Sequence, residues 1–120
     1  MKCLDTYALI EIAIGNPNFA GLISQDIVIT DITIAEFYFV MLQKYDDSTA
    51  QFWYKKFEPY CSLVLKDILI KAVKFRYVNK KEELSFFDCV GYIFSVEYNH
   101  QFVTGDKAFK SKKNVLFMEK

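Results

Sequence analysis

The feature that most constrains the fold of this chain is an alternation of short apolar runs with longer, helix-like segments. The expected strands are residues 2–4, 27–29, 61–65, 101–103 and 115–117. The expected helices are residues 6–14, 32–43, 48–57, 67–78 and 85–99. Short apolar strands that alternate with helices are typical of parallel sheets covered on both faces. We therefore expect a three-layer α/β/α sandwich with a mostly parallel central sheet of four to five short strands.

The size and composition fit one such domain. The chain has 120 residues, of which 52% are hydrophobic and 25% are charged. These values exclude disordered, collagen-like and low-complexity classes. We expect a single domain over residues 1–120, because a chain of this length is enough for one core.

The cysteines and the apolar runs indicate a cytoplasmic protein. The three cysteines are Cys3, Cys61 and Cys89. An odd number without a C-x-x-C pair argues for reduced, buried thiols and against a disulfide scaffold or a zinc site. No run reaches the roughly 18 apolar residues of a membrane helix. Asp5 and Glu11 interrupt the apolar N-terminal stretch, which therefore does not read as a signal peptide.

Four acidic residues stand out by their position. Asp5 directly follows the first expected strand and Asp106 follows the fourth, and sites in open parallel sheets lie at the carboxyl ends of strands. Glu36 and Asp88 are each the only charge in a long apolar segment, and we expect both to be buried. A buried carboxylate without a cation nearby is unfavourable. A divalent metal held by several carboxylates would neutralise all four.

Helix capping is an alternative explanation for the same acids. Glu36 and Asp88 each lie three residues after a hydroxyl residue, which is the capping-box pattern. Asp5 and Asp106 are candidate N-caps. Capping does not exclude metal binding, because an acid in the first turn also lies in the favourable field of the helix dipole.

Other charged residues have simpler expected roles. We expect Asp31 to cap the helix that carries Glu36, and Glu11 to face outward. The net charge is zero, so the chain would not hold nucleic acid by bulk charge alone. Four lysines nevertheless follow Asp106 closely: Lys107, Lys110, Lys112 and Lys113. They are either a phosphate-binding edge, with Lys107, Lys110 and Lys112 as candidate substrate contacts, or a solvated tail.

Three stretches of the sequence resemble a known family. LDTYAL at the N-terminus, IAE at Glu36 and SFFDCVGYIFSVEYNHQFVTGDKAF resemble the PIN domain, and most of all the VapC-type toxin ribonucleases of VapBC toxin–antitoxin systems. The resemblance covers essentially the whole chain and implies a PIN-like α/β/α sandwich. It places the family's catalytic, metal-binding quartet on Asp5, Glu36, Asp88 and Asp106, and it implies Mg²⁺ or Mn²⁺ as the cofactor.

The resemblance also implies supporting residues, and it has two departures. Hydroxyls that support the metal ligands would be Thr6, Thr104 and Ser85. Family members often carry Arg or Asn where this chain has Gly105, and a further acid where it has Ala108. The quartet itself is complete, so the missing acid puts only a second metal in question.

The function implied is hydrolysis of RNA phosphodiester bonds by a metal-dependent endoribonuclease toxin. We expect Asp5, Asp88 and Asp106 to contact the metal, and Glu36 to hold it through water or to orient the attacking water. Two alternatives stay open, a PIN-like binding module without cleavage and a PIN nuclease of RNA maturation. A haloacid-dehalogenase phosphatase is excluded because its second acid would fall on Tyr7.

Aromatic residues make up 18% of the chain, which is more ring surface than a small core needs. Six of them cluster in two neighbouring helices: Phe37, Tyr38, Phe39, Phe52, Trp53 and Tyr54. An exposed apolar patch of this kind commonly marks an interface. The family resemblance implies a homodimer and a groove for an antitoxin protein, in addition to the RNA substrate, and no contact with a membrane.

Overall fold

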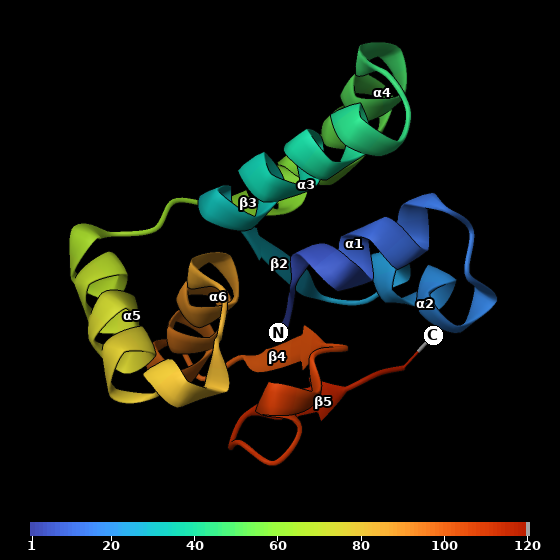
Figure 1. The fold of residues 1–120 in the computed structure, drawn as a ribbon. Coiled ribbons are helices and arrows are strands. Elements are labelled where there is room, and N and C mark those ends of the chain that lie inside the picture. The colour runs from blue at the N-terminus through green and yellow to red at the C-terminus, as the bar shows by residue number, and fades with distance from the viewer. Residues whose placement is uncertain (120) are drawn as a thin grey trace.

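The computed structural model describes residues 1–119 and contains one five-stranded sheet (Figure 1). The strands are β1 (Lys2–Leu4), β2 (Ile27–Thr30), β3 (Cys61–Ser62), β4 (Gln101–Thr104) and β5 (Val115–Phe117). Their order across the sheet is β3-β2-β1-β4-β5, and every neighbouring pair is parallel. The predicted α/β fold is confirmed, with the sheet wholly rather than mostly parallel.

Helices cover both faces of the sheet, as expected for parallel strands joined by crossovers. They are α1 (Thr6–Ala13), α2 (Pro17–Ala20), α3 (Asp31–Lys44), α4 (Asp47–Phe57), α5 (Lys66–Val78) and α6 (Phe86–Glu97). Single turns η1 (Gly21–Ser24), η2 (Glu58–Tyr60), η3 (Lys80–Glu82) and η4 (Lys107–Phe109) complete the chain. In Figure 1, α3 and α4 project beyond the sheet as an arm. None of the helices described is both long and apolar enough to cross a membrane.

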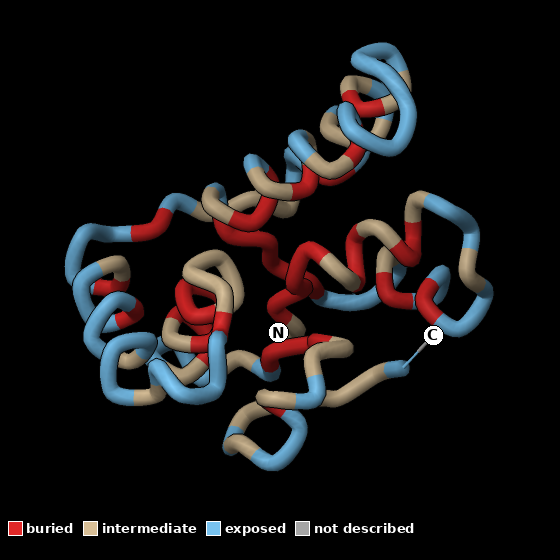
Figure 2. The backbone as a smooth tube through the Cα atoms, in the orientation of Figure 1, coloured by how far each residue is buried: buried red, intermediate tan, exposed pale blue. Residues whose placement is uncertain are grey.

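The core has two halves because successive strand residues point to opposite faces. Leu4, Ile29 and Val103 pack with α1, α3 and α4, whereas Cys3 and Phe102 pack with α5 and α6. Figure 2 shows the buried residues concentrated in the strands and on the inner sides of these helices. The sheet is thus fixed from both sides, and all its carboxyl ends lie at one edge.

The third strand is shorter than the sequence indicates. We expected residues 61–65, but β3 ends at Ser62, and Leu63 and Leu65 are 72% and 55% exposed. Ser62 pairs with Thr30, which is the last residue of β2. Since β3 lies at the edge of the sheet and has no other neighbour, it has no ladder to continue beyond that pair.

Three expectations about acids on the helices are wrong. The cap of α3 is Thr30, whose Oγ1 accepts a hydrogen bond from the backbone N–H of Thr33 at 3.0 Å. Asp31 is therefore the first helical residue rather than the cap, and the capping box proposed for Glu36 does not exist. Glu11 is only 4% exposed, because the Asn16 side chain folds back and donates to its Oε1 at 2.9 Å.

Candidate active site

The fold brings two strand-end acids to the carboxyl edge of the sheet. Asp5 follows β1, and its Oδ1 accepts the backbone N–H of Ala8 at 2.8 Å as the cap of α1. Asp106 follows β4, and its Oδ1 accepts the backbone N–H of Ala108 at 2.9 Å as the cap of η4. The capping prediction is confirmed for both. These bonds fix the two carboxylates at the ends of neighbouring strands β1 and β4.

Helices α3 and α6 supply the other two acids. Asp88 lies in the first turn of α6, where its backbone N–H donates to Ser85 Oγ at 3.1 Å. Glu36 lies in the second turn of α3 and accepts a hydrogen bond from Thr6 Oγ1. Both acids are half-buried rather than buried, because this edge of the sheet is open to solvent. Only Asp5, at 2% exposure, is fully enclosed.

The four carboxylates are close enough to act on one another electrostatically. Burial raises the pKa of Asp5 well above its ordinary value, and the charges of Asp88 and Glu36 raise it further. Burial also raises the pKa of Asp88, and the charges of Glu36 and Asp106 add to the effect. Hydrogen bonds from Thr104 and Ala8 partly offset the shift at Asp5. Each member of the predicted quartet is thus linked to another member.

No cation balances this cluster within residues 1–119. The two ion pairs found there join Lys71 to Glu97 and Lys112 to Glu82. In the same part of the chain, no three His, Cys, Asp or Glu side chains are placed to hold a metal ion together. The carboxylates therefore share one neighbourhood without converging on a single point.

The donor set still fits a hard divalent cation. Carboxylate oxygens are the ligands that Mg²⁺ and Mn²⁺ prefer, and a cation would relieve the crowding that shifts the pKa of Asp5 and Asp88. Asp5 is already oriented by its cap, whereas Asp88 and Glu36 are on more open helix turns.

The PIN domain family model matches residues 2–115. This chain belongs to the PIN domain family. No curated protein matches the sequence. The predicted family and fold are both confirmed, and the match covers the acids at both ends of the chain.

Three solved structures with the same fold are a toxin and two toxin–antitoxin complexes. VapC20 of Mycobacterium tuberculosis, described as a sarcin–ricin-loop-cleaving toxin, has a TM-score of 0.77 and 13% identity, covering 94% of this chain and 95% of that one. A toxin–antitoxin complex from Klebsiella pneumoniae has a TM-score of 0.73 and 16% identity, and the match covers 97% of this chain and 96% of that one. VapBC2 of Rickettsia felis, bound to a promoter DNA fragment, has a TM-score of 0.73 and 15% identity, and the match covers 98% of this chain and 96% of that one.

Hydroxyl groups contact the acids of this PIN domain where the resemblance places them. Thr6 donates to Glu36, and Thr104 bonds to the Asp5 carboxyl. Thr104 Oγ1 also accepts the backbone N–H of Asp106 at 3.1 Å, so one threonine holds two members of the quartet. These contacts make the hydroxyls suitable for orienting the acids.

The three lysines predicted to contact the substrate have different surroundings. Lys107 is exposed, and Lys110 Nζ lies 5.0 Å from the ring centroid of Phe117. Lys112 is held by Glu82, with Nζ to Oε1 at 3.1 Å. Lys112 is therefore less free to follow a substrate than Lys107.

Tyr7 is a residue at this edge that the sequence pattern does not mark as part of the site. A Cβ atom added to Gly105 would lie 2.4 Å from Cε1 of the Tyr7 ring. The ring therefore fills the space that a side chain at position 105 would need. An Arg or Asn of the family pattern at this position would therefore meet Tyr7, and the only signal in the sequence is the bulk of that residue.

The aromatic cluster of α3 and α4 is divided between core and surface. Phe37 is fully buried and packs edge-to-face on Phe57, with ring centroids 5.3 Å apart. Phe39 and Phe52 are 59% and 54% exposed. The expectation that some of these rings are not needed for the core therefore holds for Phe39 and Phe52.

Proposed function

We propose that this PIN domain is an Mg²⁺- or Mn²⁺-dependent endoribonuclease that acts as the toxin of a toxin–antitoxin pair. The observation that carries the proposal is the gathering of Asp5, Glu36, Asp88 and Asp106 at the carboxyl edge, with no cation paired to them among the described residues. Crowded carboxylates that lack a basic partner are the arrangement expected of a metallonuclease before its metal binds.

Asp5, Asp88 and Asp106 would hold the metal, and Glu36 would orient the attacking water. When bound, a divalent ion would lower the pKa of a water molecule and neutralise the charge that develops on the phosphate. Thr6 keeps Glu36 in place through its hydrogen bond. Thr104 does the same for Asp5 and Asp106. Such supporting bonds commonly matter for metal affinity and rate.

The toxin role and its partners rest on the likeness to VapC structures. Two of these neighbours are toxin–antitoxin complexes, and a third is a toxin that cleaves the sarcin–ricin loop. We propose an RNA substrate, a homodimer and an antitoxin protein by the same likeness. The exposed rings Phe39 and Phe52 on the α3–α4 arm suit a surface that a protein partner covers.

A binding module without cleavage is the second candidate. Two observations favour it: no three acids in the described residues are placed for one metal, and Ala108 replaces a further acid. A PIN nuclease of RNA maturation is a third candidate. A co-encoded short antitoxin and growth arrest on expression, relieved by that antitoxin, would distinguish the toxin from the maturation enzyme.

The deciding experiment is cleavage of mixed single-stranded RNA with Mn²⁺ or Mg²⁺ by the wild-type protein, Asp5→Asn and Glu11→Gln, purified in parallel. Both variants neutralise an acid that is almost fully buried, but Glu11 lies outside the quartet. We expect cleavage by the wild type and Glu11→Gln, its loss in Asp5→Asn, and its loss with EDTA. Equal traces in all three would indicate contamination. A folded wild type that stays inactive on varied RNAs would favour the binding module.

A further inference from the structure

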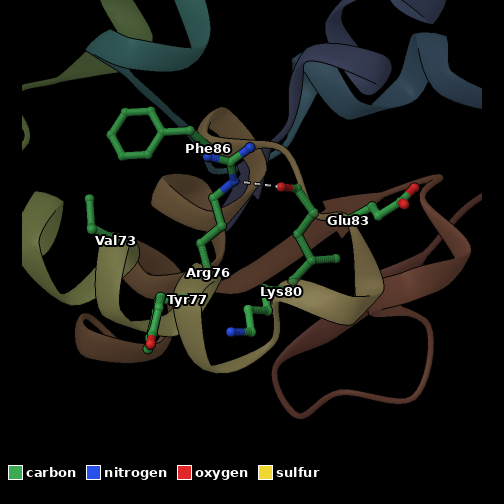
Figure 3. Close-up of a pocket in the computed structure, with 7 residues that line it drawn as sticks. Val73, Arg76, Tyr77, Lys80, Glu83 and Phe86 are labelled. Atoms are coloured by element: carbon green, nitrogen blue, oxygen red, sulfur yellow. Dashed lines mark hydrogen bonds between the residues drawn. The ribbon is translucent and has the colours of Figure 1, made fainter.

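A pocket of about 360 Å³ lies beside the start of α6, between α5 and η3 (Figure 3). Its lining combines two cations, one acid and apolar groups: Arg76, Lys80, Glu83, Val73, Tyr77, Leu84 and Phe86. Val73 and Tyr77 are 51% and 69% exposed, so apolar surface is left open to solvent there. A pocket that joins a cation to uncovered apolar surface suits a ligand with a charged group and a flat ring.

Arg76, the only arginine of the chain, is held in this pocket by the backbone. Its Nε donates to the carbonyl oxygen of Leu84 at 2.8 Å. In Figure 3 the guanidinium lies next to Phe86, and the carboxylate of Glu83 points away from it. The bond leaves both Nη groups of the planar fork without a hydrogen-bond partner in the described residues. A pre-oriented arginine fork is the side chain best suited to a phosphate.

The pocket adjoins the acidic edge along the chain and in space. Phe86 lines the pocket and lies in the same first helical turn as Asp88. Ser85, which caps that turn and bonds to the backbone N–H of Asp88, stands between the pocket residues Leu84 and Phe86. Arg76 and Asp88 both act electrostatically on Cys89. A strand of RNA at the acids could therefore place a neighbouring nucleotide here.

We propose that this pocket binds one nucleotide of single-stranded RNA next to the bond cut at the acidic edge. Arg76 takes the phosphate of that nucleotide, and Phe86 and Val73 pack against its base. This inference rests on the proposed nuclease function for the position of the pocket on the substrate. The binding of a nucleotide can be tested without it.

The charge of the lining favours a nucleotide over a peptide or an uncharged ligand. Arg76 and Lys80 outnumber Glu83, so the pocket carries a net positive charge. Lys80 Nζ lies 4.9 Å from the ring centroid of Tyr77, which keeps the second cation near the opening. The whole chain has no net charge, so a polyanion gains from a local positive excess such as this one.

The test uses three variants that each lower the net charge by one. Arg76→Ala removes the fork. Val73→Glu puts a carboxylate into the pocket at an exposed position and leaves the bond between Arg76 and Leu84 intact. Lys74→Ala is the matched control, because Lys74 is exposed on the same helix but does not line the pocket. Thermal unfolding of each variant checks that the fold is kept.

The first readout is methyl NMR of Val73 and Leu84 (Leu84 alone in Val73→Glu) during titration with the 5′-monophosphates of adenosine, guanosine, cytidine and uridine. EDTA is present, so that no metal can draw phosphate to the acids. We expect saturable shifts of these methyl groups in the wild type and in Lys74→Ala. Binding should be at least about fivefold weaker in Arg76→Ala and in Val73→Glu. Equal affinity in all four proteins, or shifts that avoid the pocket, would overturn the proposal.

The second readout is RNA cleavage, which separates this proposal from the proposed function. We expect Arg76→Ala and Val73→Glu to raise KM at least about fivefold over Lys74→Ala, with kcat within about twofold. Equal cleavage by these three variants would overturn the proposal that the pocket binds a nucleotide, but it would not contradict the nuclease function. Absence of cleavage in every protein, with the NMR result intact, would overturn the nuclease and leave a nucleotide pocket. A change in oligomeric mass in Val73→Glu with unchanged nucleotide binding would assign the pocket to a protein contact and overturn the proposal.

Discussion

The two ends of α1 each bury an acid, and the two acids have different surroundings. Asp5 caps the start of the helix and is 2% exposed, and Glu11 lies near the end and is 4% exposed. Other carboxylates surround Asp5, and their charges raise its pKa. Glu11 instead receives a hydrogen bond from the Asn16 amide at 2.9 Å. One end of the helix is left with uncompensated negative charge, and the other has a local partner.

This contrast shows that burial alone does not mark a functional acid. A buried carboxylate can be satisfied by a nearby amide, as at Glu11, and then it serves the fold. A carboxylate crowded by others of the same charge remains unfavourable until something positive arrives. The distinction therefore depends on the neighbours of the acid, and four experiments test it.

Neutralising Asp5 should weaken metal binding strongly, whereas neutralising Glu11 should leave it nearly unchanged. We expect Asp5→Asn to weaken Mn²⁺ binding by at least about 100-fold, because a ligand is lost, whereas supporting residues typically cost 10–100-fold. Glu11→Gln should bind Mn²⁺ within about twofold of the wild type. Isothermal titration calorimetry measures both. Similar weakening in the two variants would mean that α1 as a whole, rather than its first end, controls the site.

Removing the hydroxyl of Thr6 should slow the reaction without changing the fold. Thr6 Oγ1 donates to Glu36, and Thr6→Val loses that bond while keeping the shape of the side chain. We expect about a tenfold fall in the RNA cleavage rate. Thr6→Ser, which keeps the hydroxyl, should recover most of the rate. If Thr6→Ser is as slow as Thr6→Val, packing rather than the hydrogen bond is responsible.

Removing the partner of Glu11 should affect stability only. Asn16→Ala loses the bond to Glu11 and also the cap of α2, in which Asn16 Oδ1 accepts the backbone N–H of Asn18 at 3.0 Å. We expect a loss of about 1 to 2 kcal/mol in the free energy of unfolding. Urea denaturation measures it. Cleavage per folded molecule should not change, and a large loss of activity would contradict the separation of the two ends.

The metal-free protein should become less stable as the pH rises. The pKa of Asp5 and that of Asp88 are raised in the folded state, so the native protein holds more protons than the unfolded chain above about pH 4. Its melting temperature should therefore fall by a few degrees between about pH 4 and neutrality. Saturating Mn²⁺ should flatten or reverse this slope. Asp5→Asn should also flatten it, whereas Glu11→Gln should keep it, and an unchanged slope in Asp5→Asn would contradict the assignment.

The parts of this molecule that depend on local sequence pattern could be predicted from the sequence. Apolar runs locate all five strands, and strand-end position together with isolation in apolar segments selects the four acids that the fold gathers. The end of β3 depends on where β2 stops, so the run 61–65 cannot reveal it. The burial of Glu11 depends on an amide five residues later, in a turn. The pocket at Arg76 needs a backbone carbonyl that only the folded chain brings near.

The contact between Tyr7 and Gly105 limits the order in which this site can change over evolution. Tyr7 also packs edge-to-face on Phe19, with ring centroids 5.7 Å apart, so the ring has little room to retreat. A larger residue at 105 therefore requires the Tyr7 ring to move or position 7 to become smaller. A mutation that places an arginine or asparagine beside Asp106 is therefore coupled to position 7, two residues after Asp5 and at the other end of the sequence.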